Sequence, residues 1–249
     1  MLAFFFFLLG AALGSFLNVV IHRLPEGKSL LSPPSHCPIC GKSIRWFDNI
    51  PIISYIILKG ECRDCGTSIP IRYLIVESIT AFVYLYSYIH YGLSLELLTF
   101  LIFTTLLIPI FFIDLREMLI PDTLSISGII IGLILGIFRG ITIVSLIGAA
   151  VGAVYVLIII YLGKSIYKRD VMGMGDVKLS AMIGAFVGWA NFLLTILISS
   201  LLGSIYGIIQ IRRGKSSMKS IIPYGPFLAI GGFITFLFGK WIIVRFFLH

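Results

Sequence analysis

Long apolar runs separated by short polar segments dominate this sequence from end to end. The hydrocarbon core of a bilayer is about 30 Å thick, and a helix of about 20 apolar residues crosses it. Reading the runs against proline, glycine and charged breakers predicts about eight such helices, at 2–21, 74–91, 96–113, 124–138, 141–163, 177–190, 191–211 and 224–247. The pattern therefore predicts an all-α polytopic membrane protein with about eight transmembrane helices and both termini outside.

The sixth and seventh runs form one apolar stretch of 32 residues, 179–210. As a single helix it would be about 48 Å long, against a core of about 30 Å. A break at 188–191 divides it into two crossings, the first of them short. With that break, all of the 19 Lys and Arg except Arg139, Lys240 and Arg245 fall in cytoplasmic segments, as the positive-inside rule requires. Merging the two runs would instead export Arg212, Arg213, Lys215 and Lys219.

Composition supports a membrane protein, since 59% of the residues are hydrophobic, 12% are charged and the mean hydropathy is +1.07. These values lie far outside the range of soluble domains. The net charge of +8 does not indicate nucleic-acid binding, because the basic side chains lie in the loops that set topology. The first apolar run has no basic segment before it and no small-residue cleavage site after it, so we expect an uncleaved first helix.

One long polar segment, 22–73, interrupts the apolar pattern. It is rich in proline and contains all four cysteines of the chain, which predicts a small cytoplasmic loop domain that is not mainly helical. We therefore expect three parts: a first transmembrane helix at 1–21, the loop domain at 22–73, and a second transmembrane domain of about seven helices at 74–249.

The cysteines form a C-x2-C-x21-C-x2-C pattern, with a glycine after each pair: Cys37, Cys40, Cys62 and Cys65. Two thiolates at this spacing share one metal ion, and two such turns complete the tetrahedral sulfur shell that zinc accepts. A reducing cytoplasm disfavours disulfides. We expect one structural zinc with no open position for a substrate. A rubredoxin-like iron site and redox-active or metal-free cysteines are the alternatives.

Four acidic residues lie near the predicted cytoplasmic boundary: Glu77, Asp114, Asp122 and Asp176. Charge at an apolar span is costly, so each is a functional candidate. Asp122 follows a proline and precedes an apolar run, and we interpret it as a helix N-cap. Asp176 could cap its helix in the same way. Asp114 ends an apolar run, where an acid opposes the helix dipole, so helix stability does not explain it.

Peptide hydrolysis without a metal or a nucleophile needs two carboxylates in contact, one taking a proton from water and one donating to the scissile carbonyl. Asp114 and Asp176 are the candidates, and Gly173 and Gly175 would let a substrate backbone approach. A transporter that relays protons or cations through these acids and Glu77 is the main alternative. Relay acids are spread through the membrane depth, whereas these share one boundary. A non-catalytic zinc scaffold would leave the acids unexplained.

At these residues the chain resembles the bacterial type IV prepilin peptidases, the leader peptidase and N-methyltransferase family, which is related to presenilin-like GxGD aspartyl proteases. The shared motifs run in order along almost the whole chain: Gly14 to Val20, Arg23 to Pro25, the paired C-x2-C, Asn49 to Pro51, Ser54 with Tyr55, Arg72 with Tyr73, Glu77, Asp114, Ile120 to Asp122, Gly173 to Leu179 and Pro223 to Phe227. Leu74 and Ile120 depart from common family residues without touching the acid pair.

The resemblance implies that Asp114 and Asp176 are catalytic. It implies that prepilins of type IV pili or pseudopilins of type II secretion are the substrates, cut after a leader glycine at the cytoplasmic face of the bacterial inner membrane. It also implies methylation of the new amino terminus with S-adenosylmethionine. That activity would belong to the amino-terminal half, with Glu77 and Arg72 as candidate binding residues, although no Gly-rich cofactor motif is present. A buried ion pair between Arg72 and Glu77 is the structural alternative.

Overall fold

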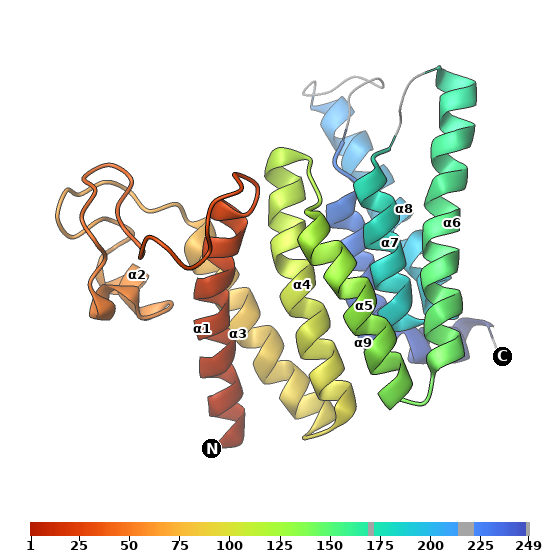
Figure 1. The fold of residues 1–249 in the computed structure, drawn as a ribbon, viewed down its shortest axis with the longest axis horizontal. Helices are drawn as coiled ribbons and strands as arrows, with labels where there is room; N and C mark the ends of the chain where they lie inside the picture. The colour runs from red at the N-terminus through yellow and green to blue at the C-terminus, as the bar shows by residue number, and fades with distance from the viewer. Residues whose placement is uncertain (169–171, 214–221, 248–249) are drawn as a thin grey trace. The chain divides into compact units, whose positions relative to one another are not determined.

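The computed structural model describes residues 1–168, 172–213 and 222–247. Within these ranges the chain is helical, and its only β structure is two isolated bridges. The helices, drawn in Figure 1, are α1 Leu2–Arg23, α2 Ile53–Ile57, α3 Arg72–Tyr91, α4 Leu95–Glu117, α5 Asp122–Phe138, α6 Thr142–Tyr167, α7 Met174–Val187, α8 Trp189–Arg212 and α9 Gly225–Phe247, with a 3₁₀ turn at Trp46–Asn49.

In the described part of the chain, five helices are long and apolar enough to cross a membrane: α1, α4, α6, α8 and α9. The expected all-helical, multi-pass membrane character is thereby confirmed. A helix also lies at each of the eight positions that the apolar pattern predicts. The helices α3, α5 and α7 are shorter or less apolar, so the count of eight crossings stays a prediction. Arg169, Lys215 and Lys219, which the charge argument places in cytoplasmic loops, lie outside the described residues.

The chain divides into two compact units, 1–101 and 102–249. In the first unit α1 packs on α3, and the contact is close because α1 has small residues there. A methyl group at Gly14 would lie 2.7 Å from the Glu77 Cα. Asn18 on α1 also holds the start of α3, because its Nδ2 donates a hydrogen bond to the Tyr73 carbonyl at 3.1 Å. The sequence predicts domain boundaries at 21 and 73. Because α1, the loop domain and α3 all lie in the first unit, these boundaries stay a prediction.

In the second unit α7 is the central helix, packed against α5, α6, α8 and α9. Residues 179–188 are all buried, so most of this helix of 14 residues is covered by its neighbours and does not face lipid. The break before α8 falls at Gly188, where the sequence predicts it. Gly188 has φ +80°, a conformation that favours glycine.

The contact of α6 with α7 brings the two helix backbones close together. A methyl group at Gly148 would overlap the Gly184 carbonyl, and a methyl at Gly184 would overlap the Gly148 carbonyl. Small residues allow membrane helices to pack through their backbones in this way. The result is a closely packed α7, and Asp176 lies in its first turn.

Candidate active site

Asp114 and Asp176 line one cavity of about 400 Å³ in the second unit. The two carboxylates lie close enough for their charges to interact. Asp114 comes from the last turn of α4 and Asp176 from the first turn of α7. The other polar side chains at the cavity are Asp122, Lys178 and Tyr224. The structure thus brings together the two acids that the sequence analysis pairs.

The Asp114 side chain is held at the amino-terminal end of α9. Only 5% of the residue is exposed, and its Oδ2 is buried without a hydrogen-bond partner. Gly225, at the start of α9, packs against the carboxylate, because a methyl group there would lie 2.5 Å from Asp114 Oδ2. A helix N-terminus favours negative charge, so α9 supplies the stabilisation that the carboxyl end of α4 denies to this acid.

Asp176 both caps its helix and presents a free oxygen. Its Oδ2 accepts a hydrogen bond from the Gly173 N–H at 3.2 Å, whereas its Oδ1 is buried without a partner. Gly173 is the N-cap residue, and Asp176 is the third helical residue of α7. The side chain that caps the helix therefore belongs to a residue within its first turn. One oxygen orients the side chain and the other is free for chemistry.

The two glycines before Asp176 differ in their surroundings. A methyl group at Gly173 would meet no heavy atom closer than 3.8 Å, whereas one at Gly175 would lie 2.9 Å from the Ile120 Cβ. Gly173 is therefore open, as a substrate approach requires. Gly175 also lines the cavity and allows α7 to pack against Ile120, so a role of both glycines in substrate approach stays a prediction.

The N-cap interpretation of Asp122 is wrong. Pro121 is the N-cap residue of α5, and Asp122 is the first helical residue with no side-chain cap hydrogen bond. Pro121 already has the extended backbone that an N-cap adopts, with ψ 129°, so Asp122 is displaced into the helix. Its Oδ1 instead accepts a hydrogen bond from Lys178 Nζ at 2.6 Å. This ion pair joins α5 to α7 at the cavity.

The cysteines of the first unit form two turns with the same backbone pattern. In the first turn the Cys37 N–H donates to the Lys42 carbonyl and the Gly41 N–H to the Cys37 carbonyl, both at 2.9 Å. In the second turn the N–H groups of Cys62 and Gly66 repeat these bonds at 2.8 and 2.9 Å. Both glycines have φ near +70°, a conformation that glycine adopts without strain.

The sulfur atoms of the two turns meet, and the four ligand atoms lie within 4.8 Å of one another. Four sulfurs at about 2.3 Å from a tetrahedral zinc ion would be about 3.8 Å apart, and Cys37 Sγ and Cys65 Sγ are separated by 3.7 Å. The Thr67 hydroxyl and N–H lower the pKa of Cys65 to about 6, which favours the thiolate that metals bind. All four cysteines are free of disulfides. The donor set therefore fits zinc.

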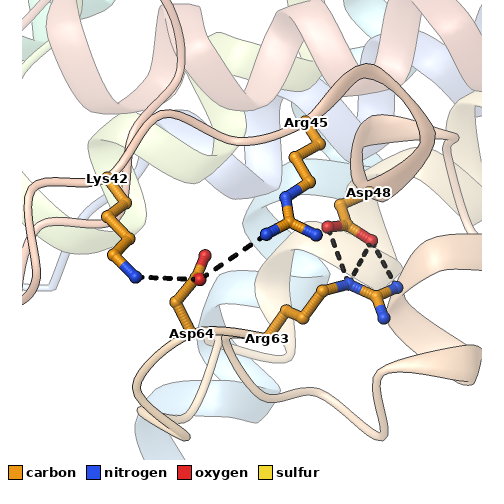
Figure 2. A network of polar contacts seen from close by, with 5 residues as sticks. All are labelled: Lys42, Arg45, Asp48, Arg63 and Asp64. Carbon is orange, nitrogen blue, oxygen red and sulfur yellow. Dashed lines mark hydrogen bonds and ion pairs between the residues drawn. The ribbon is translucent and has the colours of Figure 1, made fainter.

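Ion pairs that the sequence analysis missed link the two cysteine turns, as Figure 2 shows. Arg63, between the second pair of cysteines, donates to both oxygens of Asp48, with Nη2 at 2.6 Å from Oδ1. The guanidinium holds the pKa of Asp48 below its ordinary value. Asp64 binds Lys42 at 3.0 Å and Arg45 at 3.8 Å. Charges on the second turn thus orient the segments that follow the first.

Glu77 and Arg72, the candidate residues for methyl transfer, lie near the start of α3 and form no ion pair with each other in the described structure. The buried Glu77 accepts from the Ile52 N–H at 2.7 Å and from the Ser15 hydroxyl. The Arg72 guanidinium lies over the Tyr73 ring at 5.3 Å, and its Nε is buried without a hydrogen-bond partner. The ion-pair alternative is therefore wrong, because the Glu77 carboxylate binds the loop domain instead. The role of both residues in cofactor binding stays a prediction.

Fold and site together define a helical membrane protein in which two interacting aspartates line one cavity. Residues 8–91 match the Bacterial Peptidase A24 N-terminal domain, and residues 101–208 match the Type IV leader peptidase family. The first range includes the four cysteines and Glu77, and the second includes the three aspartates of the cavity. The chain belongs to the type IV leader peptidase family, which confirms the resemblance and the enzyme class, a peptidase.

Curated relatives support this assignment over most of the chain. A protein of Pseudomonas aeruginosa is 38% identical over 93% of this chain and 89% of its own length. One of Dichelobacter nodosus is 38% identical over 95% and 91%. One of Myxococcus xanthus is 37% identical over 84% of this chain, which spans 63% of that relative's length. Each is named prepilin leader peptidase/N-methyltransferase. No solved structure matches the chain.

Proposed function

We propose that this chain cleaves the leader peptide from prepilins or pseudopilins, with Asp114 and Asp176 as the catalytic pair. The observation that carries the proposal is the pair of buried oxygens, Asp114 Oδ2 and Asp176 Oδ1, that have no hydrogen-bond partner although both residues line one cavity. Buried polar atoms are normally satisfied. An unsatisfied oxygen on each of two neighbouring acids is what a site that binds and activates water requires.

In the proposed reaction one carboxylate is ionised and takes a proton from water, while the other is protonated and donates to the scissile carbonyl oxygen. The water oxygen bonds to the carbonyl carbon. The tetrahedral intermediate then breaks its carbon–nitrogen bond as the leaving nitrogen takes a proton from the pair. The Gly173 N–H binds Asp176, and Gly225 packs closely against Asp114, which limits the rotation of both acids and keeps them oriented for the reaction.

The substrate fits the proposed orientation of the protein in the bacterial inner membrane. In the second unit the end of α4, the starts of α5 and α7 and the residues just before α9 line one cavity, so these helix ends lie at one end of that unit (Figure 1). With eight crossings and both termini outside, that end faces the cytoplasm. A prepilin presents an apolar helix suited to the bilayer and a polar leader suited to the cytoplasm, so its junction would reach this cavity.

Cleavage of a purified prepilin by the purified chain in lipid nanodiscs tests the proposal. The product's mass should fall by that of the leader, and Asp114→Asn and Asp176→Asn should each abolish this change. Asp122→Asn is the matched control, because it removes an acid from the same cavity that is paired to Lys178 and not free. Loss of cleavage in the control alone would contradict the assignment of the pair.

We also propose that the chain methylates the new amino terminus with S-adenosylmethionine, because its relatives carry that activity in their names. Glu77 and Arg72 are the candidate residues. A carboxylate can attract the sulfonium cation, and the unpartnered Arg72 Nε can donate to a bound carboxylate. Glu77→Gln retains an oxygen for the Ile52 N–H and removes only the charge. A normal methylation rate in this variant would exclude the role of Glu77.

We further propose that the four cysteines hold one structural zinc ion that stabilises the loop domain without taking part in cleavage. Four thiolates leave no coordination position for a substrate. Metal analysis of protein prepared under reducing conditions should find about one zinc per chain. A Cys37–Cys40 disulfide in such a preparation would contradict the zinc site.

A further inference from the structure

The short helix α2 presents an apolar face that no other part of the first unit covers. Ile53, Ile56 and Ile57 are 53%, 63% and 68% exposed, and their spacing places them on one side of the helix. We call these three residues the α2 face. We propose that the α2 face inserts into the membrane surface beside α1 and α3, so that the metal-binding loop domain is held against the bilayer.

The polar groups around α2 point away from this face. The Ser54 hydroxyl is buried, donates to the Phe47 carbonyl at 2.8 Å and accepts from the Ile50 N–H at 3.0 Å. The Tyr55 hydroxyl donates to the Ile69 carbonyl at 3.2 Å. A helix with its polar side chains inside and isoleucines outside is inverted relative to the surface of a soluble domain. Full burial of an exposed isoleucine gains about 1.5–3 kcal/mol, and each of these side chains would gain the part that corresponds to its exposed surface, which favours an apolar environment.

Contacts within the unit place the start of α2 beside membrane helices. Ile52, the N-cap residue of α2, donates from its N–H to Glu77 on α3, and Glu77 also accepts from Ser15 on α1. Ser15 lies two turns before the end of α1 at Arg23, which is about 12 Å along the helix axis. With Arg23 among the headgroups, the α2 helix begins near the headgroup and acyl boundary, where amphipathic helices bury their apolar faces by about 5–10 Å.

The Glu77 contact also fixes an unusual backbone conformation. Ile52 has φ +64°, which is rare and strained for a β-branched residue. The 2.7 Å hydrogen bond to a buried carboxylate holds this conformation, and the following residues turn into α2. A buried acid in α3 thus sets the direction in which the α2 face points.

Residues on both sides of α2 are typical of a membrane interface. Trp46 is 81% exposed, and tryptophan is enriched where one side of the ring meets lipid and the other water. Arg45 precedes the helix in sequence and Lys59 follows it, both are exposed, and basic residues near a membrane surface attract anionic headgroups. Charge and aromatic placement favour a lipid surface over a second protein as the occupant of the α2 face.

Collision accessibility of a nitroxide side chain tests this inference. The label replaces Ile56, or Ile39 as the matched control, through an unnatural amino acid, because the cysteines are needed for metal binding. Ile39 is also isoleucine, is 70% exposed and lies between the cysteines of the first turn. Both proteins are placed in nanodiscs of phosphatidylethanolamine and phosphatidylglycerol, and metal content is measured to confirm that the loop domain is folded.

We expect the label at 56 to collide with oxygen, which partitions into lipid, and to be at least about fivefold less accessible than the label at 39 to a water-soluble nickel complex, as burial at the acyl boundary requires. Equal nickel accessibility at the two positions would overturn the inference, because the face would then be in water. Shielding of position 56 from both reagents would also overturn it, because a protein surface would then cover α2.

Discussion

The catalytic assignment makes an unusual prediction about stability: the variants that lose cleavage should not lose folding free energy. Asp114 is 5% exposed, and its Oδ2 is buried without a partner. A carboxylate charge in a buried site is costly even where water binds it. Asn has the same size and is neutral, so Asp114→Asn should leave the melting temperature unchanged or raise it. Enzymes commonly sacrifice stability in this way at active sites.

Asp176→Asn should behave similarly, because the amide oxygen can still accept the Gly173 N–H that Asp176 Oδ2 accepts at 3.2 Å. Asp176→Ala would lose this bond, and a lost cap costs about 0.5–2 kcal/mol. It would also remove the unpartnered Oδ1, so the two effects oppose each other. Comparison of the Asn and Ala variants in thermal unfolding therefore separates capping from chemistry, while cleavage should be lost in both.

The magnitude of the catalytic loss follows from the loss of one proton-transfer group, which costs about 10²- to 10⁴-fold in rate. This corresponds to about 2.7–5.5 kcal/mol of activation free energy. Because the two acids act as one unit, the cleavage rate of the double Asn variant should be within about threefold of the rate of the slower single variant. Asp122→Asn breaks a partly exposed ion pair, worth about 0–1 kcal/mol, and should slow cleavage by less than about fivefold.

The assay is the initial rate of prepilin cleavage in nanodiscs, with metal content and melting temperature measured on the same samples. Substantial cleavage by either single Asn variant would refute the two-aspartate mechanism. A fall in melting temperature that matches the loss of cleavage would show instead that the acids are structural. Multiplicative losses in the double variant would show that the acids act in separate steps.

Three further outcomes are expected. Gly225→Ala should reduce the cleavage rate by at least about tenfold, because the added methyl would lie 2.5 Å from Asp114 Oδ2 and misorient that acid. The control Gly207→Ala, whose methyl meets nothing closer than 3.6 Å, should cleave normally. Gly184→Ala should lower the free energy of unfolding by about 1–3 kcal/mol through overpacking against α6, and an unchanged melting temperature would contradict the close helix contact. Cys62→Ser should abolish zinc binding, measured by metal analysis, and full zinc occupancy in this variant would contradict the four-sulfur site.

The local pattern of apolar and polar residues determined the positions of most helices of this protein. Helix positions follow from apolar runs and breakers, because a helix in lipid must satisfy its own backbone within one continuous segment. The cysteine spacing likewise predicted a four-sulfur cluster, since each turn forms within a few residues and needs glycine at Gly41 and Gly66. The choice of Asp114 and Asp176 came from chemistry and chain topology, and the shared cavity agrees with it.

Contacts between distant segments decided the remaining features. Asp122 was interpreted as a cap because capping is a local rule, but Lys178 on another helix binds it. The hydrogen bond from the Ile52 N–H to Glu77 could not be predicted from the sequence, because no periodic pattern connects a buried acid in α3 to one N–H group in a loop. Gly225 also gave no local signal for its contact with Asp114. Sequence patterns report what one segment does with solvent and with its own backbone, whereas the partner of each polar group depends on which helices pack together.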